Sequence, residues 1–280
     1  MKGNRRIIVV AVAVAVLCAA VVYLPGFVRQ QNSDLRVREI SLSSDRAPAA
    51  GLRIVQLSDL HGKQFGENNT DLLEKIRAQS PDLIVFTGDL IDNPKDVELV
   101  LAFMGELVQS APTLGVFGNH EARTGERSEF KERLEARGVV VLDNEIKDIT
   151  LANVRVQVLG FDENNLTRRK HLRHLPLLEE LEASAGLRIV LSHYPQEYSR
   201  SEAASFEPFG FDLMFAGHAH GGQWIIPGIG GLYAPGQGIF PTYYRGLYDN
   251  RLVVSPGLGN SHLPLRLNNF PEIIVVDLSP

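Results

Sequence analysis

The segment LRIVQLSDLH, residues 52–61, joins a short apolar run to a polar end. Residues 52–57 have the β-branched and leucine side chains of a buried strand, and Asp59 and His61 follow directly. The same order of apolar run and polar residue recurs later in the chain. The further runs are LIVF (83–86) before Asp89, LGVF (114–117) before Asn119 and His120, LRIVL (187–191) before His193, and FDLMF (211–215) before His218 and His220.

Helical stretches separate several of these runs, and Asn69 or Thr70 can cap the first of them. Helices are predicted at residues 70–79, 95–108 and 127–137, and two further strands at residues 154–160 and 272–278. Strands that alternate with helices predict an α/β layered fold. The short apolar strands are expected to be buried on both faces.

Polar residues at strand ends point to a ligand site, because ligands in α/β sheets bind at the carboxyl ends of strands. The side chains expected to converge are Asp59, His61, Asp89, Asn119, His120, His193, His218 and His220. Carboxylates and imidazoles are metal ligands, and these groups are too many for one four-coordinate ion. They suit two ions about 3.5–4 Å apart that share a bridging carboxylate, the arrangement that hydrolyses phosphoryl groups.

Taken singly, most of these motifs also have an ordinary explanation. An Asp-x-His after a strand is explained equally well by a turn aspartate and a surface histidine, and Asp89 suits a turn cap. The stretch GHAHGG (217–222) is more specific, because its glycines let the backbone turn sharply and approach an ion. All the motifs together, in this order, favour a metal site.

The five motifs resemble the five sequence blocks of the calcineurin-like metallophosphoesterase superfamily, from about Arg53 to the C-terminus. The motifs are DLH (59–61), GDLID (88–92), GNHE (118–121), SHYP (192–195) and GHAHGG (217–222). GHAHGGQW together with PLRLNNFPEIIVVDL is similar to the N-terminally membrane-anchored bacterial branch, which includes small phosphodiesterases and UDP-2,3-diacylglucosamine pyrophosphatase-like proteins. The resemblance implies a two-sheet α/β sandwich.

The resemblance also implies a role for each matching residue. The first metal ion would be bound by Asp59, His61 and His220. The second would be bound by Asn119, His193 and His218, with Asp89 bridging both ions. His120 would lie beside the scissile phosphate as a catalytic residue, oriented by Asp92.

The implied chemistry is hydrolysis of phosphoester or pyrophosphate bonds by a metal-bridging hydroxide, because two cations lower the pKa of a shared water. Mixed His, Asp and Asn ligands accept Mn, Fe, Co or Zn. Two alternatives stay open. One is an amidohydrolase-type dinuclear hydrolase, whose His-x-His pair belongs on the first strand of a TIM barrel. The other is a non-catalytic, membrane-tethered metal-binding module.

The N-terminus reads as a membrane anchor. Residues 7–24 contain no charged side chain, and about 20 apolar residues span a bilayer. Lys2, Arg5 and Arg6 precede this run and predict a cytoplasmic N-terminus and an extracytoplasmic catalytic domain. A cleaved signal peptide is the rival interpretation. The predicted organisation is an anchor at residues 1–28 with a transmembrane helix over 7–28, a polar linker at 29–50 and a catalytic domain at 51–280.

Composition narrows the classes of partner. The net charge of −5 gives no electrostatic case for nucleic acid as the main partner. The single cysteine, Cys18, lies in the apolar run, so an intrachain disulfide and thiol catalysis are excluded. A domain tethered by residues 7–28 is expected to meet phosphorylated small molecules or lipid-linked phosphates at a membrane or cell envelope.

Overall fold

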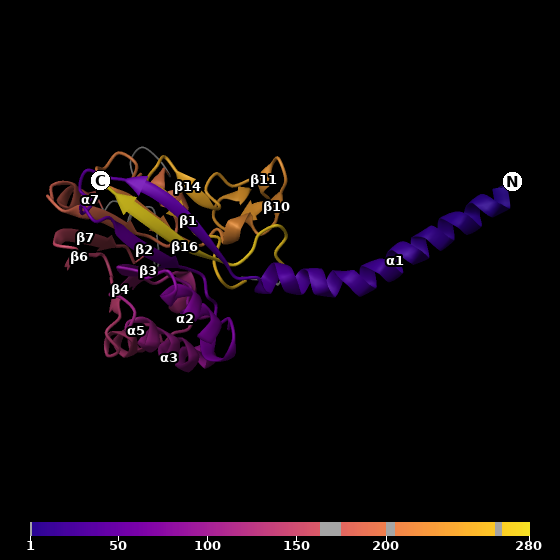
Figure 1. Ribbon diagram of the computed structural model, residues 1–280, viewed down its shortest axis with the longest axis horizontal. Helices are drawn as coiled ribbons and strands as arrows, with labels where there is room; N and C mark the ends of the chain where they lie inside the picture. Colours follow the sequence, from indigo (N-terminus) through magenta and orange to yellow (C-terminus); the bar gives the residue numbers. More distant parts are fainter. Residues whose placement is uncertain (1, 163–174, 200–204, 261–264) are drawn as a thin grey trace.

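Two mixed β-sheets packed face to face form the centre of the protein (Figure 1), as seen in a computed structural model that describes residues 2–162, 175–199, 205–260 and 265–280. Helix α1 (Lys2–Ser33) extends away from these sheets. The predicted α/β sandwich with two sheets is therefore confirmed.

The first sheet has the strand order β1-β16-β2-β3-β4-β5 over the described residues. Strands β2 to β5 run parallel, whereas β16 is antiparallel to β2 and parallel to β1. The strands are β1 (Arg36–Ser43), β2 (Leu52–Leu57), β3 (Leu83–Thr87), β4 (Thr113–Val116), β5 (Val140–Val141) and β16 (Glu272–Ser279). The ends of β2, β3 and β4 consequently lie at one edge of the sheet.

The second sheet has the order β14-β15-β9-β8-β7-β6, again within the described ranges. Its inner strands β15, β9, β8 and β7 run parallel, and the edge strands β14 and β6 are antiparallel to their neighbours. The strands are β6 (Glu145–Leu151), β7 (Val154–Gly160), β8 (Leu187–Leu191), β9 (Leu213–Ala216), β14 (Gly246–Tyr248) and β15 (Leu252–Val254). These are open sheets, so the barrel expected for an amidohydrolase-type enzyme is not the fold of the described chain.

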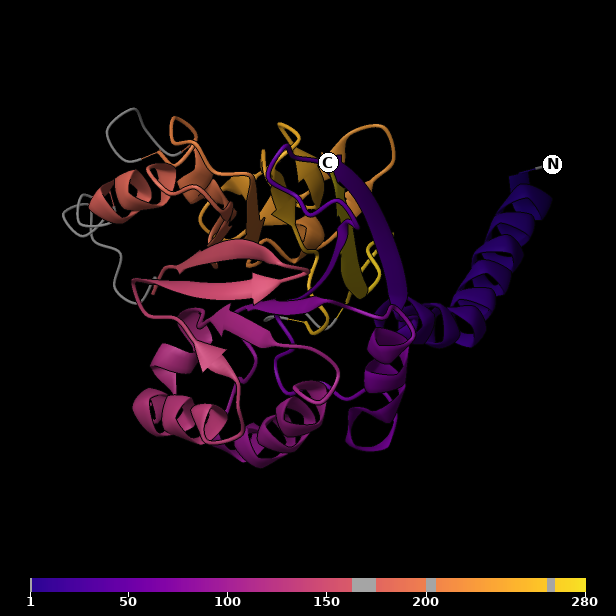
Figure 2. The ribbon, with the colours of Figure 1, turned by 60° about the vertical axis from the view of Figure 1, so that its left-hand side comes forward.

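Helices cover the outer faces of both sheets (Figure 2). Ile54 and Val85 point between the sheets, whereas their neighbours Val55 and Ile84 point towards helices, as the two-residue period of a strand requires. The covering helices are α2 (Thr70–Arg77), α3 (Val97–Leu107) and α5 (Arg127–Glu135) on the first sheet and α7 (Leu175–Glu182) on the second. Each fully buried aliphatic side chain contributes about 1.5–3 kcal/mol, so the loops at the strand ends have a rigid base.

Short elements complete the fold. They are η1 (Glu67–Asn69), η2 (Pro94–Asp96), α4 (Asn119–Arg123), η3 (Pro195–Tyr198), η4 (His220–Gly222), β10 (Ile225–Ile226), β11 (Gly230–Gly231), β12 (Tyr233–Ala234) and β13 (Gly238–Ile239). Two of them matter for the site, because α4 begins at Asn119 and η4 begins at His220.

The N-terminal region differs from the prediction. Residues 36–43, expected within a polar linker, form strand β1, which pairs with β16 along its whole length. Its polar residues misled the prediction, because Ile40 and Leu42 of this edge strand pack between the sheets while Glu39, Ser41 and Ser43 on the other face are exposed. Where helices are described, none is long and apolar enough to cross a membrane, so the transmembrane helix expected over residues 7–28 lacks support.

Candidate metal centre

The carboxyl ends of strands from both sheets meet at one rim of the sandwich. The two sheets are joined there by Gln56 of β2, whose Nε2 donates to the carbonyl oxygen of Ala216 at the end of β9 (2.8 Å). The residues that follow β2, β3, β8 and β9 thus approach one another. This convergence brings together aspartates and histidines that are far apart in the sequence. The backbone N–H of His218, for example, donates to Asp59 Oδ1 at 3.1 Å, although the two residues are 159 positions apart.

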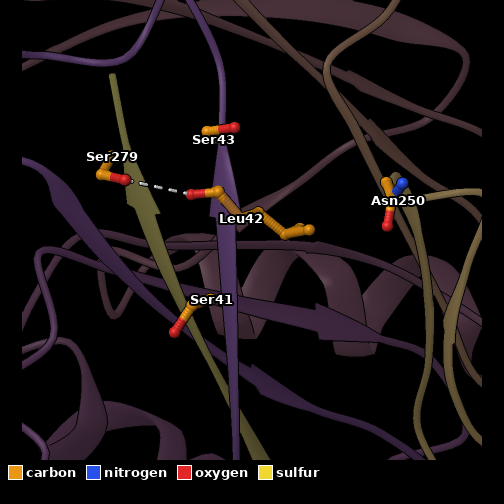
Figure 3. A pocket seen from close by; sticks show the side chains of 5 residues that line it. All are labelled: Ser41, Leu42, Ser43, Asn250 and Ser279. Atoms are coloured by element: carbon orange, nitrogen blue, oxygen red, sulfur yellow. Dashed lines mark hydrogen bonds between the residues drawn. The ribbon is translucent and has the colours of Figure 1, made fainter.

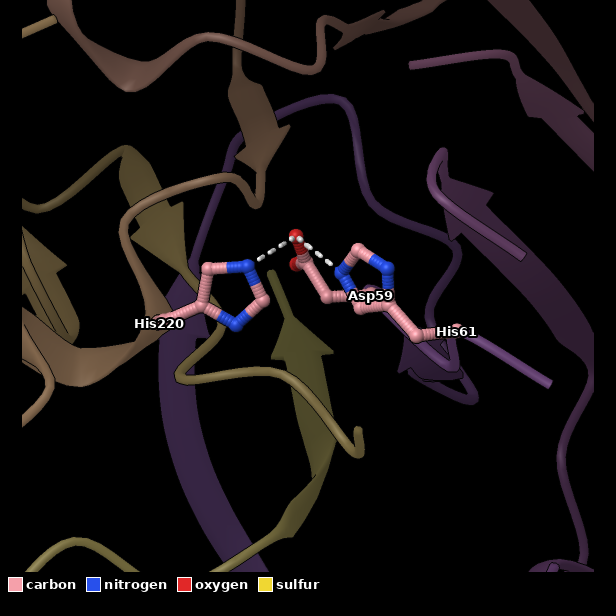
Figure 4. A group of neighbouring side chains, drawn as sticks. All are labelled: Asp59, His61 and His220. Carbon is pink, nitrogen blue, oxygen red and sulfur yellow. Dashed lines mark ion pairs between the residues drawn. The ribbon is translucent and has the colours of Figure 1, made fainter. Parts of the chain in front are cut away.

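One set of converging side chains, called the first group, consists of Asp59, His61 and His220 (Figure 4). His220 Nε2 lies 3.5 Å from Asp59 Oδ1, and His61 Nε2 lies 4.0 Å from the same oxygen. All three residues are buried. His61 Nε2, which is 4.0 Å from Asp59 Oδ1, has no hydrogen-bond partner among the described residues. A buried nitrogen atom left in this way next to a carboxylate fits a cation.

A second group consists of Asp89, His193 and His218, whose potential ligand atoms also lie within 4.8 Å of one another. His193 Nε2 is 3.2 Å from Asp89 Oδ2 and 3.1 Å from His218 Nδ1. The other ring nitrogen of His193 faces the Thr87 carbonyl oxygen at 2.7 Å, which fixes the ring orientation as outer contacts commonly do for metal-bound histidines. Asn119 adjoins this group through Tyr194, whose hydroxyl donates to Asn119 Oδ1 (3.5 Å) and whose ring contacts His218.

Asp89 lies between the two groups. Its Oδ2 is 3.2 Å from His193 Nε2 in the second group and 3.9 Å from His61 Nε2 in the first. Its Oδ1 accepts the backbone N–H of His120 at 2.8 Å, which holds the carboxylate in place. A single carboxylate therefore faces imidazoles from both groups.

Asp92 contacts two histidines rather than one. Its Oδ1 lies 2.8 Å from His120 Nδ1, the contact expected from the resemblance, and it also bonds His61 Nδ1. His120 Nε2 lies 3.9 Å from Asp89 Oδ2 and accepts a hydrogen bond from Arg123 (3.3 Å) in the tautomer with Nδ1 protonated. Burial opposes the charge of Asp92, but its bonds to His120 and His61 hold the pKa of its carboxyl well below the usual value.

The backbone at the site adopts a left-handed conformation at five of the proposed ligands. The φ angles are 51° at Asp59, 52° at His61, 54° at Asp89, 64° at His218 and 46° at His220. This conformation is unfavourable by about 1–2 kcal/mol per residue when a side chain is present. Backbone hydrogen bonds hold it, such as His61 N–H to the Asp89 carbonyl oxygen (3.0 Å). Strain of this kind is concentrated at functional sites.

Two glycines allow the loops to pack closely around these side chains. A Cβ on Gly217 would lie 2.0 Å from Ser58 Oγ, and one on Gly118 would lie 2.3 Å from Asp89 Oδ1. The loop after β2 therefore requires a glycine at position 217, which explains why a residue without a side chain precedes His218 in the GHAHGG motif.

The electrostatics prepare three of the proposed ligands, Asp89, His218 and His220, for a cation. Burial opposes ionisation of Asp89, but the facing imidazoles, His193 above all, hold the pKa of its carboxyl well below the usual value. Burial also lowers the pKa of His218 and of His220 well below the usual value for an imidazole. Ionised carboxylates and neutral imidazoles are the forms that bind metals.

Glu121 is a positioning residue that the sequence analysis did not assign. Its buried carboxylate accepts backbone N–H groups of Asp89 (3.0 Å), Ile91 (3.2 Å) and Gly118 (2.8 Å), together with that of Leu90. It therefore clamps the loop after β3 to the loop after β4. The signal was present in the sequence, because Glu121 completes the GNHE motif.

Surface pockets lined by described residues lie away from this centre. One of about 460 Å³, shown in Figure 3, lies between the ends of β1 and β16 and is lined by Ser41, Leu42, Ser43, Asn250 and Ser279. Ser279 in β16 lies just beyond the Leu278–Leu52 pair, at the start of β2, so this pocket is at the opposite end of the sheet from Asp59. With no titratable side chain in its lining, it is not a candidate for hydrolysis.

Comparison with known proteins agrees with this geometry. Residues 52–222, more than half of the chain, match the family model described as calcineurin-like phosphoesterase. The uncharacterized metallophosphoesterase YkoQ of Bacillus subtilis (strain 168) is 28% identical over 91% of this chain and 95% of its own length. The phosphodiesterase YaeI of Escherichia coli (strain K12) is 30% identical over 82% of this chain and 83% of its own.

The fold and the site together define a metal-dependent phosphoric ester hydrolase. The chain belongs to the calcineurin-like phosphoesterase family, whose members use divalent metal ions, and it presents candidate ligands for two of them. The superfamily expected from the five motifs is thus confirmed.

Proposed function

We propose that this metallophosphoesterase hydrolyses phosphodiester or pyrophosphate bonds at a dinuclear centre. The position of Asp89 carries the proposal, because its Oδ2 faces His193 on one side and His61 on the other, at 3.2 and 3.9 Å. A carboxylate shared in this way suits two adjacent ions rather than two separate sites.

In this proposal each group of side chains binds one ion. Asp59, His61 and His220 bind the first ion, Asn119, His193 and His218 bind the second, and Asp89 bridges them. Manganese, iron, cobalt and zinc all accept this mixture of ligands. The bound ions would supply a hydroxide from a shared water and neutralise charge on the phosphate.

His120 is proposed to act on the substrate directly, with Asp92 as its positioning residue. Asp92 bonds Nδ1 at 2.8 Å, and the other ring nitrogen, Nε2, lies 3.9 Å from Asp89 Oδ2 at the centre, where Arg123 also contacts it. A protonated Nε2 there can donate to the leaving oxygen of a phosphoester. General acid catalysis of this kind contributes about 10²–10⁴-fold. A purely structural metal site would need neither His120 nor Asp92.

The test uses the full-length protein with added Mn²⁺ and three kinds of substrate. We expect hydrolysis of bis(p-nitrophenyl) phosphate, a phosphodiester, and none of amides or lactones. Turnover of amides or lactones alone would instead support an amidohydrolase-type enzyme. Metal binding with no turnover of any substrate would support a non-catalytic module.

We also propose that the enzyme works at a membrane or cell envelope, with a cytoplasmic N-terminus and an extracytoplasmic catalytic domain. The uncharged run at residues 7–24 and the basic residues before it support this location. Described apolar side chains of α1, among them Leu17, Val21 and Val22, are exposed outside the body of the protein. The substrate would be a phosphorylated small molecule or a lipid-linked phosphate. Membrane fractionation and a reporter fused to the C-terminus test the location; a reporter active on the cytoplasmic side would contradict it.

A further inference from the structure

A pocket of about 440 Å³ lies where α1 meets the body, between the end of that helix and α2. Its volume is in the range of small-molecule sites, which is about 300–1,000 Å³. Arg29 and Ser33 of α1, Lys63 and Phe65 of the loop after β2, and Lys75 of α2 line it. No proposed metal ligand is part of its lining, so it is separate from the metal centre.

The charges in this pocket, called the α1-foot pocket, are not balanced. Two cations, Arg29 and Lys75, line it together with Lys63, and none of the three forms an ion pair with a described residue. Burial lowers the pKa of the Lys63 ammonium to about 7, so Arg29 and Lys75 are the groups charged throughout the neutral range. Of its two carboxylates, Asp34 is already paired with Arg36, outside the pocket, at 3.0 Å, which leaves Asp71 as the remaining negative charge. A desolvated ammonium without a carboxylate partner is unfavourable, and an anionic ligand removes that penalty.

Both lysines are held in place by backbone carbonyl oxygens at or just after the end of α1, and Lys63 also by one beyond β15. Lys63 Nζ donates to the carbonyl oxygens of Asn32 and, at 3.1 Å, Leu258, and Lys75 Nζ donates to that of Leu35. An ammonium has three N–H donors, so each lysine keeps at least one for a ligand. Lys63 also lies over the Phe65 ring, 4.6 Å from its centroid, which restricts it further. The cationic groups are thus positioned before any ligand arrives.

We propose that the α1-foot pocket binds a phosphate-bearing anion. Several fixed donors around one cavity match the oxygens of a phosphate better than a single surface lysine does. The anion can be a free phosphate or the headgroup of an anionic lipid. A headgroup is close at hand if α1 lies at a membrane, because Arg29 comes only five residues after the uncharged run ends at Leu24.

The experiment measures anion binding by the full-length, Mn²⁺-loaded protein and three variants. Inorganic phosphate is titrated calorimetrically, and vesicles of phosphatidylglycerol in phosphatidylcholine are compared with phosphatidylcholine alone in co-sedimentation. Lys75→Gln and Arg29→Gln each remove one pocket cation. Arg77→Gln is the matched control, since Arg77 lies on the same helix but pairs with Glu106 (3.2 Å) and does not line the pocket.

We expect Lys75→Gln and Arg29→Gln each to weaken the binding of anions roughly tenfold, the effect of one charge-assisted hydrogen bond, while Arg77→Gln has no effect. Hydrolysis of bis(p-nitrophenyl) phosphate stays unchanged in all three variants, which separates this site from the metal centre. If the pocket variants bind only inorganic phosphate more weakly, the ligand is a free anion. If they bind phosphatidylglycerol vesicles more weakly, the ligand is a lipid headgroup. If neither pocket variant differs from Arg77→Gln with either probe, the proposal is wrong. Because Arg29 is exposed, Arg29→Gln is expected to fold, and it still tests the proposal if Lys75→Gln unfolds.

Discussion

The two groups of the metal centre differ in how their protons are held. In the first group, burial raises the pKa of the Asp59 carboxyl, and although burial opposes a charged His61, its bond to Asp92 raises the pKa of that imidazole. In the second group, the pKa of Asp89 and that of His218 both lie well below their usual values. Asp89 and His218 therefore favour the protonation states that bind a cation, whereas the shifts at Asp59 and His61 favour the protonated forms, which do not bind one.

The two groups also differ in what supports them. The second is built on the ends of β3, β8 and β9, with His193 held by a backbone carbonyl of β3. In the first, the backbone N–H of His218 also bonds Asp59, but side chains add support, since Ser58 donates to Asp59 (2.6 Å) and Asp92 bonds His61. Side-chain support is easier to alter by substitution than a backbone contact. The ion in the second group should therefore bind more firmly than the ion in the first.

The largest effect is expected for Asp89→Asn, because this residue serves both groups. Losing the shared charge should lower kcat/KM for bis(p-nitrophenyl) phosphate by roughly 10³-fold or more and reduce the content of both ions. Asp148→Asn is the matched control, since Asp148 pairs with the exposed Arg155 and is not one of the proposed ligands. Metal analysis beside the kinetics checks the prediction, and a variant that keeps both ions and near-normal activity would contradict the bridging role.

His120→Gln should separate catalysis from metal binding. We expect kcat to fall by about 10²-fold or more, because a general acid is lost while no ligand is removed. The content of both ions should remain that of the unaltered protein. Loss of an ion from this variant would show that His120 is a ligand rather than a catalytic residue.

Ser58→Ala should affect only the first group. It removes the hydroxyl that donates to Asp59 Oδ2, and the loss of such a supporting contact typically lowers metal affinity about 10–100-fold. Stepwise Mn²⁺ titration should show one weakened ion and one unchanged ion. Equal weakening of both ions would mean that the groups are not independent.

The smallest effect is a difference in pH dependence between the two ions. A raised pKa means that His61 holds its proton to a higher pH than an ordinary imidazole, so an ion competes with that proton for the first group. Lowering the pH from about 7.5 to 6.5 should therefore weaken one ion by up to tenfold. The ion in the second group should change less, because His218 is neutral throughout that range. Equal weakening of both ions would contradict the proposed difference between the two groups.

Much of the fold was accessible from local sequence patterns. The helices expected at 70–79, 95–108 and 127–137 correspond to α2, α3 and α5, because each has an apolar face and a clear start or stop. The prediction failed at β1, where one side of an edge strand is polar and resembles a linker. It also missed α4 and the short strands after η4, which have too few residues to show a period.

The sequence by itself determined which donor atoms exist and that they follow strands, because a short apolar run and the polar residues after it are local features of the chain. Only the tertiary structure decided which donors face one another. The grouping of Asp59 with His220, the central position of Asp89 and the second contact of Asp92 with His61 all depend on how two separate sheets pack. That packing is set by side chains far apart along the chain, so no local pattern encodes it.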